Sequence, residues 1–374
     1  MIDVNVASSR PAVSFLPTTA VLEMTYRCDH ACLFCSCPWS DEGGDFKKGR
    51  ELDAREWKEV LRTVSSLGVA QLCFTGGEAL LREDLWEIIA FARSLKDAKI
   101  VERGKKLALK REPFRLYLIS NGAHVDDRVL KLCKKYRVQL SMSLPGLKTF
   151  PELTGGGDPD KVLRAFTLAK RMGLFTVVNV TVTRKNLPEF YETIAAGLLA
   201  GADQLLMNVF LKGGRGLRHA AELALSSEEI GQALEQAEQV LEEAGRFGSV
   251  GTELPKCLVP VREYKRLEVA SRCSAATGFF VIGPSGYVRV CNHSPLDLVF
   301  YREIETLKNN DYWCRFTQKQ YLPQRCLACP EMGRCDGGCR EEAHIVAGAV
   351  DAVHELVSAC DSVSAAPLKN GTGL

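Results

Sequence analysis

The first half of the chain alternates between short apolar runs and longer segments in which apolar residues recur every three or four positions. Short runs of this kind are typical of buried strands, and the longer segments are typical of amphipathic helices. The expected strands cover residues 21–25, 70–75, 116–120, 138–143, 176–183 and 205–211. Six such strand–helix units predict an α/β fold, a partial (β/α)6 TIM-like barrel with a parallel sheet.

Two helices have clear start signals. Asp53 and Glu56 are spaced as a capping box, and Gly68 is expected to end the helix that follows. Ser226 and Glu229 form a second box before an amphipathic segment. From these landmarks we expect a leader at residues 1–17, a barrel at 18–220, a bridging helical segment at 221–254, a cysteine-rich domain at 255–361 and a disordered tail at 362–374.

An unusual segment lies between the second expected helix and the third expected strand. Residues 99–111 carry a basic excess and alternating apolar residues around Gly104. This pattern is typical of a β-hairpin. Such a hairpin either is a solvated surface feature or offers an edge to which an acidic leader peptide could add as a strand.

The first expected strand is followed by a group of three cysteines, Cys28, Cys32 and Cys35. Three thiolates in one loop can hold three irons of a cubane [4Fe–4S] cluster, which leaves one iron without a protein ligand. A zinc site with Cys37 as the fourth ligand and plain buried thiols are the alternatives. The motif after the second expected strand favours the cluster.

That motif is Gly76-Gly77-Glu78. Glycines allow the backbone to approach a ligand closely at a strand end, and the carboxylate can accept hydrogen bonds from an ammonium group. Since the chemistry of parallel barrels lies at the carboxyl ends of the strands, other polar residues at these ends are candidates too. These are Asn121 and Ser143 as cofactor contacts, and Asn208, Lys212 and Arg215 as further contacts on the same rim or as parts of solvated loops.

A second group of cysteines occupies the C-terminal third. It consists of Cys326-x2-Cys329-x5-Cys335-x3-Cys339 followed by Cys360, and of Cys273-x12-Gly286-x4-Cys291 upstream. Spacing this regular is not expected by chance.

The first cysteine loop and Gly76-Gly77-Glu78 together resemble the radical S-adenosylmethionine (AdoMet) enzymes, also called radical SAM enzymes. The resemblance implies that AdoMet chelates the open iron, that one electron cleaves it to a 5′-deoxyadenosyl radical, and that this radical abstracts a hydrogen atom from the substrate. In this family Gly-Gly-Glu binds the AdoMet amino group. Asn121 and Ser143 would hold the ribose, the methionine carboxylate or the adenine.

The second group resembles the seven-cysteine SPASM extension of peptide and protein maturases. The resemblance implies two auxiliary [4Fe–4S] clusters, and so three clusters in all. Cys326, Cys329, Cys335 and Cys360 would hold the distal cluster, and Cys273, Cys291 and Cys339 the cluster nearer the active site. Either Cys257 is the fourth ligand of this near cluster or one of its irons stays open. Cys37 and Cys314 are candidate hydrogen-atom donors, a group that radical peptide epimerases require.

Composition agrees with this interpretation. The chain has 374 residues and a formal net charge of +2, with no bulk basicity that would indicate a nucleic-acid partner. Fifteen cysteines in an oxidising compartment would suggest disulfides, but their spacings match cluster ligation. With no signal peptide and no apolar run long enough to span a membrane, we expect a cytoplasmic protein without a membrane partner.

The resemblance favours an enzyme that cross-links or oxidises a residue of a ribosomally made peptide. The alternatives are an anaerobic sulfatase-maturating enzyme that forms formylglycine, and an AdoMet-dependent dehydrogenase or epimerase of a carbohydrate or another small molecule. A non-enzymatic electron carrier would leave Gly76-Gly77-Glu78 unused. Expected partners are a peptide or protein substrate and an electron donor such as flavodoxin or ferredoxin. Since a cluster loop starting at Cys28 leaves no room for an N-terminal recognition domain, a separate recognition protein or direct leader binding would complete the set.

Overall fold

A computed structural model describes residues 15–41, 43–103, 106–258 and 264–358. Within these residues, one sheet has eleven strands in the order β10-β9-β8-β7-β6-β5-β2-β1-β11-β12-β13. Neighbouring strands are parallel from β10 to β11, and β12 and β13 continue the sheet antiparallel. The strands are β1 (Thr19–Glu23), β2 (Gln71–Thr75), β5 (Arg115–Ser120), β6 (Val138–Ser143), β7 (Thr176–Val182), β8 (Gln204–Val209), β9 (Phe247–Val250), β10 (Leu267–Val269), β11 (Phe279–Ile282), β12 (Tyr287–Arg289) and β13 (Val299–Phe300).

All six expected strands are present, as β1, β2, β5, β6, β7 and β8, so the α/β class and the partial barrel are confirmed. The strands that extend the sheet at its two edges were not expected from the sequence. β9 and β10 add to β8, and β11 pairs with β1 in parallel, with Thr19 opposite Phe279 and Leu22 opposite Ile282. The sheet therefore continues across the expected boundary between the barrel and the cysteine-rich region.

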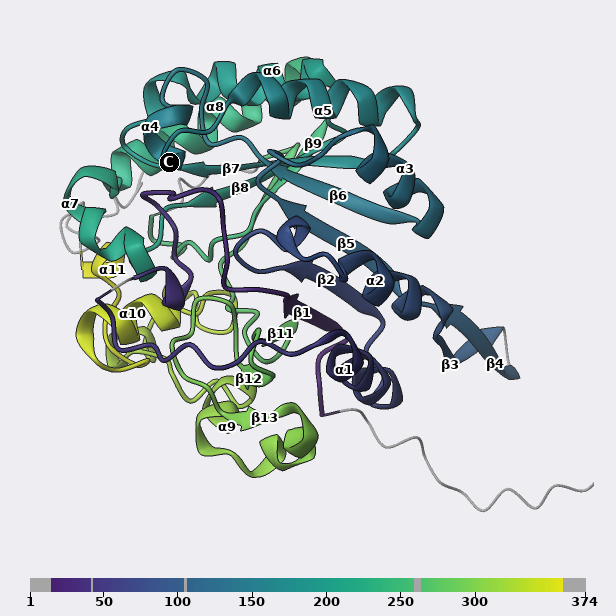
Figure 1. Cartoon of the computed structure of the whole chain (residues 1–374). Coiled ribbons are helices and arrows are strands. Elements are labelled where there is room, and N and C mark those ends of the chain that lie inside the picture. The colour runs from purple at the N-terminus through teal and green to yellow at the C-terminus, as the bar shows by residue number, and fades with distance from the viewer. Residues whose placement is uncertain (1–14, 42, 104–105, 259–263, 359–374) are drawn as a thin grey trace, which may run out of the picture.

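Helices follow the strands and cover the outer face of the sheet (Figure 1). The principal ones are α1 (Ala54–Ser66), α2 (Leu85–Ser94), α3 (Asp127–Tyr136), α5 (Pro159–Arg171), α6 (Phe190–Ala200) and α8 (Ser227–Ala244). Both predicted capping boxes are confirmed, at Asp53 and Glu56 for α1 and at Ser226 and Glu229 for α8. Gly68, with a φ of 85°, lies just beyond the end of α1 as expected.

Burial alternates along the barrel strands. In β2, Leu72 and Phe74 are fully buried, whereas Gln71, Cys73 and Thr75 between them are only partly buried. Because successive side chains of a strand point to opposite faces, the apolar set packs in the core and the other set points to the opposite face of the sheet. Polar side chains at the strand ends are thereby directed into the interior of the barrel.

The C-terminal region lies beside the ends of the barrel strands and contains α9 (Asp311–Thr317), α10 (Arg340–Ala347) and α11 (Glu355–Ser358) (Figure 1). The carboxylate of Asp336 is buried and accepts hydrogen bonds from the Cys273 amide (2.8 Å), the Lys319 ammonium (2.8 Å) and the Tyr321 hydroxyl (3.1 Å). A single side chain thus ties the segment around Cys273 to the cysteine-rich loop.

The predicted hairpin is confirmed as β3 (Lys96–Arg103) and β4 (Lys106–Pro113), which form a separate antiparallel sheet. Its turn at Gly104 lies outside the described residues, as do most of the predicted leader and all of the predicted tail. None of the helices in the described part of the chain is both long and apolar enough to cross a membrane. Other short helices are α4 (Phe150–Thr154) and α7 (Ala220–Leu223).

Candidate functional site

The loop that carries Cys28, Cys32 and Cys35 is held on both sides by backbone hydrogen bonds. The amides of Ala31 and Leu33 donate to the carbonyls of Thr154 and Leu153, each at 2.9 Å, at the end of α4. On the other side the amide of Gly216 donates to the Cys35 carbonyl at 3.0 Å. The three thiols are therefore placed by a fixed backbone.

The two glycines after β2 allow this strand end to lie against the segment that enters the cysteine loop. The amide of Gly77 donates to the Thr25 carbonyl and the amide of Glu78 to the Arg27 carbonyl, both at 2.8 Å. A Cβ atom on Gly77 would lie 2.1 Å from the Arg27 carbonyl oxygen, and Gly76 has a φ of 138°. Side chains are excluded from both positions by space and by backbone conformation.

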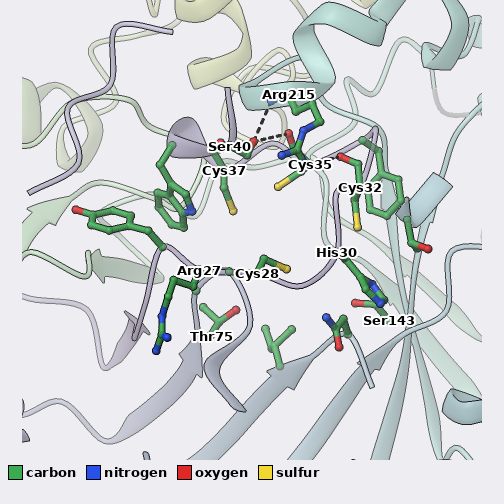
Figure 2. Close-up of a pocket in the computed structure, with 18 of the residues that line it drawn as sticks. Arg27, Cys28, His30, Cys32, Cys35, Cys37, Ser40, Thr75, Ser143 and Arg215 are labelled. Carbon is green, nitrogen blue, oxygen red and sulfur yellow. Dashed lines mark hydrogen bonds between the residues drawn. The ribbon is translucent and has the colours of Figure 1, made fainter. Parts of the chain in front are cut away.

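A cavity of about 730 Å³ lies at the carboxyl ends of the strands and is bordered by Cys28, Cys32, Cys35 and Cys37. Figure 2 shows the four sulfur atoms turned toward the middle of this cavity. Candidate residues from the sequence that also line it are Gly76, Gly77, Asn121, Ser143 and Arg215. Lining residues that were not expected from the sequence include Tyr26, Arg27, His30, Trp39, Ser40, Lys48 and Phe150.

Glu78 is buried behind this cavity and does not line it. Its carboxylate accepts hydrogen bonds from the amides of Asn121 (2.7 Å) and Leu80 (3.0 Å) and from the Ser120 hydroxyl (3.1 Å). Burial raises the pKa of Glu78 above its usual value. The side chain therefore fixes the end of β5, and with it Asn121, whose own amide group donates to Asp29 at 2.7 Å. Direct contact between Glu78 and AdoMet stays a prediction.

The thiols around the cavity differ in acidity. A hydrogen bond with the Cys37 thiol lowers the pKa of Cys35 to about 6, and the same bond together with burial raises the pKa of Cys37 well above its usual value. Burial raises the pKa of Cys28 to about 11. Arg215 lies beside this group, and its guanidinium donates to the Cys32 carbonyl at 3.3 Å. The arrangement places a cationic side chain where clustered thiolates would need one.

A second cavity, of about 300 Å³, adjoins the first and shares Cys35 and Cys37 with it. It is bordered by Cys273, Cys291 and Cys339, the three cysteines expected to hold the near auxiliary cluster. Glu253, His293 and Glu341 in its lining were not expected from the sequence. Asn208 lines this cavity and not the first, and its side-chain amide donates to Asn179 at 2.9 Å.

The lining of the second cavity is rich in acidic and thiol groups, and its described residues include no Lys or Arg. Burial raises the pKa of Cys273 and Cys339, and the neighbouring Glu253 carboxylate raises each further. Burial raises the pKa of Cys291, and the neighbouring Glu341 carboxylate raises it further. No three such groups in the described part of the chain are gathered closely enough to hold a single metal ion. Three cysteines that border one cavity of this size fit a group that several thiolates bind together, such as an iron–sulfur cluster.

The expected distal ligands lie in one loop. Cys326 and Cys329 are joined by a backbone hydrogen bond of 3.2 Å, and the Cys335 sulfur accepts from the amides of Gly337 (3.3 Å) and Lys256 (3.4 Å). Cys360 lies outside the described residues.

Two other candidate cysteines, Cys257 and Cys314, do not line the second cavity. Cys257 directly follows Lys256, whose amide contacts the Cys335 sulfur, and it does not line the second cavity. Its role as the fourth ligand of the near cluster stays a prediction. Cys314 lines neither cavity, and its thiol donates to the Lys308 carbonyl at 3.4 Å.

Comparison with known proteins agrees with this geometry. Residues 22–196 match the family model described as the radical SAM superfamily. The chain contains a radical SAM domain. That domain spans the strands from β1 to β7 and includes the first cysteine loop and Gly76-Gly77-Glu78.

Among curated proteins, the chain is 28% identical over 341 residues to the PqqA peptide cyclase of Xanthomonas campestris pv. campestris (strain B100), covering 89% of this chain and 84% of that protein. It is 27% identical over 348 residues to the PqqA peptide cyclase of Granulibacter bethesdensis, covering 90% and 85%.

Among solved structures, Streptococcus suis SuiB bound to S-adenosylmethionine has a TM-score of 0.67 at 15% identity, covering 91% of this chain and 77% of that one. The protein anSMEcpe with bound AdoMet has a TM-score of 0.66 at 15% identity, covering 92% and 91%. These likenesses show a shared fold that extends beyond the radical SAM domain into the C-terminal region.

Proposed function

We propose that the protein is a radical SAM enzyme that cross-links or oxidises a residue of a ribosomally made peptide. The observation that carries the proposal is that Cys28, Cys32 and Cys35 border the same cavity as Gly76 and Gly77. When bound there, a [4Fe–4S] cluster and AdoMet would supply the 5′-deoxyadenosyl radical. A cavity of about 730 Å³ is within the size range of small-molecule sites.

The protein's own residues would bind the cluster and position AdoMet. Cys28, Cys32 and Cys35 would hold three irons, and the backbone at Gly76 and Gly77 would meet the amino-acid part of AdoMet. The Ser143 hydroxyl lines the cavity from the end of β6, on the same side as His30 (Figure 2). It would donate to the ribose or to the adenine.

The curated relatives supply the substrate class. Both are named PqqA peptide cyclases, and they align over most of their length with this chain. We therefore propose a peptide substrate, in which hydrogen-atom abstraction leads to a new intramolecular bond. An electron donor such as flavodoxin or ferredoxin, a separate recognition protein and a cytoplasmic location complete the proposal.

We further propose three [4Fe–4S] clusters. The near one would be bound by the thiols of the second cavity and the distal one by Cys326, Cys329 and Cys335 together with Cys360. Because the two cavities share Cys35 and Cys37, the near cluster would lie next to the site of radical formation. Bound there, it would be close enough to accept an electron from a substrate radical.

Two measurements test this function. The anaerobically reconstituted protein should hold about twelve irons per chain, and the triple replacement of Cys28, Cys32 and Cys35 by Ala should remove about four of them and abolish 5′-deoxyadenosine formation. With AdoMet, a reductant and peptides encoded beside the gene, mass spectrometry should show a peptide that has lost two hydrogens. AdoMet cleavage that is stimulated by a sugar or by a sulfatase peptide, and by none of these peptides, would contradict the substrate class.

A further inference from the structure

Five cysteines line the second cavity, whereas a [4Fe–4S] cluster has four irons to ligate. Cys35 and Cys37 also line the first cavity and are hydrogen-bonded to each other, which leaves Cys273, Cys291 and Cys339 for the near cluster. Cys257 does not line this cavity and Cys37 is hydrogen-bonded to Cys35, so the fourth ligand can come from another residue of the lining. A ligand role for such a residue rests on the near cluster of the proposed function.

Glu253 lies on a firmly held stretch of this lining. It follows the end of β9 by three residues, and its neighbours Thr252 and Leu254 are buried. The Thr252 hydroxyl accepts from the Val209 amide at 3.0 Å, and the Leu254 amide donates to the Ala270 carbonyl at 2.8 Å. With both neighbours anchored in the sheet, the side chain between them is presented to the cavity that it lines.

The Glu253 carboxylate also lacks the partners that its acidic neighbours have. Among the described residues it forms no ion pair, and beyond its own backbone it accepts a single long hydrogen bond of 3.4 Å, from the Ser274 amide. Glu341 accepts from the Tyr312 hydroxyl at 2.9 Å, and Glu342 pairs with His354 at 2.6 Å. Arg340 acts on the Glu253 carboxylate only from beyond ion-pair distance. A partly buried carboxylate is stabilised by a positive group in direct contact, so we expect such a group at Glu253.

The position of the carboxylate beside Cys273 identifies that group. Ser274, whose amide donates to Glu253, is the residue after Cys273, and Glu253 lies near enough to act on the thiols of Cys273 and Cys339. His293 is the rival, because its Nδ1 has no partner among the described residues. Its Nε2 atom lies 3.1 Å from the Lys212 carbonyl oxygen, in the loop after β8, and the variant His293→Ala separates the two candidates.

We propose that the Glu253 carboxylate is the fourth ligand of the near auxiliary cluster, beside Cys273, Cys291 and Cys339. A carboxylate oxygen is a harder and weaker donor than a thiolate. The iron that it would hold is therefore the one most easily exchanged. A cluster with three thiolate ligands has a higher reduction potential than one with four, just as histidine ligands raise the reduction potential of Rieske centres.

The test uses electron paramagnetic resonance and redox titration of the full-length reconstituted protein. The signal that disappears in Cys291→Ala is assigned to the near cluster. Glu253→Gln should shift the g values of this signal and leave the other two clusters in place, and Glu253→Cys should restore a complete cluster with a more negative midpoint potential. Cys257→Ala and the exposed Glu268→Gln, as matched controls, should leave the signal unchanged.

The inference is overturned if Glu253→Gln and Glu253→Cys both show the wild-type signal and midpoint potential, or if the near signal moves in Cys257→Ala or His293→Ala instead. If Glu253→Gln fails to fold, the midpoint potential of the near cluster in Glu253→Cys alone tests the inference. A wild-type protein with only about four irons has a different meaning: it would remove the proposed auxiliary clusters themselves.

Discussion

Glu78 shows that a residue can be important for a cavity that it does not border. Its buried carboxylate collects hydrogen bonds from the end of β5 and fixes the backbone of Asn121, which does line the cavity. The residues of the motif Gly76-Gly77-Glu78 thus have two different roles. The glycines give space for the backbone, and the glutamate positions the neighbouring strand end.

Glu78→Gln should weaken AdoMet binding while all clusters are retained. The change weakens the hydrogen bonds that hold Asn121 at the cavity and removes the charge predicted to face the AdoMet ammonium group. A charge-assisted hydrogen bond to that group is worth about 1.5–3 kcal/mol, which corresponds to roughly one to two decades in affinity. Isothermal titration under anaerobic conditions measures the effect. Ser120→Ala should give a smaller loss of the same kind. If Ser120→Ala binds AdoMet as tightly as wild type, Glu78 acts by direct contact and not by positioning.

Gly77→Ala should disrupt the first cysteine loop. The added methyl group would lie 2.1 Å from the Arg27 carbonyl oxygen, so the end of β2 must move away from the segment that leads into Cys28. We expect the loss of about four irons per chain, the content of one cluster. Gly231→Ala on α8, where a Cβ meets nothing within 4 Å, is the control and should keep every iron. Retention of full iron content in Gly77→Ala would contradict this role for the glycine.

At the scale of single elements, the sequence predicted most of the barrel correctly. The six strands and two capping boxes were identified because each has a strong local signal, either a short apolar run or a fixed spacing of cap residues. β9, with the sequence Phe-Gly-Ser-Val, and β10, with three residues, are too short for any periodicity. Glu253 was missed for the same reason, because its place in the lining depends on a strand that the sequence does not reveal.

The cap of α8 can be tested on its own. Ser226→Ala removes the side-chain acceptor for the Glu229 amide and should lower the free energy of unfolding by about 1 kcal/mol. The midpoint of denaturant unfolding measures this change. Ser227→Ala, one position further into the helix, should lie within a few tenths of a kcal/mol of wild type. Equal midpoints for the two variants would show that the capping box contributes nothing measurable.

At the scale of the whole molecule, a buried ion pair links the radical SAM domain to the C-terminal region. Glu23 at the end of β1 pairs with Arg289 at the end of β12, and both side chains are excluded from solvent. Arg289 also donates to the Ser294 carbonyl at 2.8 Å and lies 5.3 Å from the ring of Trp39. The cysteine loop, the first strand and the C-terminal region meet at this pair. No pattern in the sequence could have paired two residues so far apart in the chain.

Glu23→Gln should destabilise the protein by about 3–5 kcal/mol, because it leaves the Arg289 guanidinium buried without its counter-charge. The double variant Glu23→Leu with Arg289→Met, which removes both charges, should recover much of this loss. Denaturant unfolding of the two variants beside wild type gives the comparison. A single variant as stable as wild type would show that Asp297 or solvent compensates the charge.

The pairing of β11 with β1 also has a consequence for how this protein could change over time. A chain cut after residue 254 would expose the whole of β1 as an open, apolar strand edge, and such an edge is a template for aggregation. The cysteine-rich C-terminal region therefore also covers the edge of β1. A lineage could not discard or exchange it as a separate module without rebuilding that strand, so the two parts are expected to be inherited together.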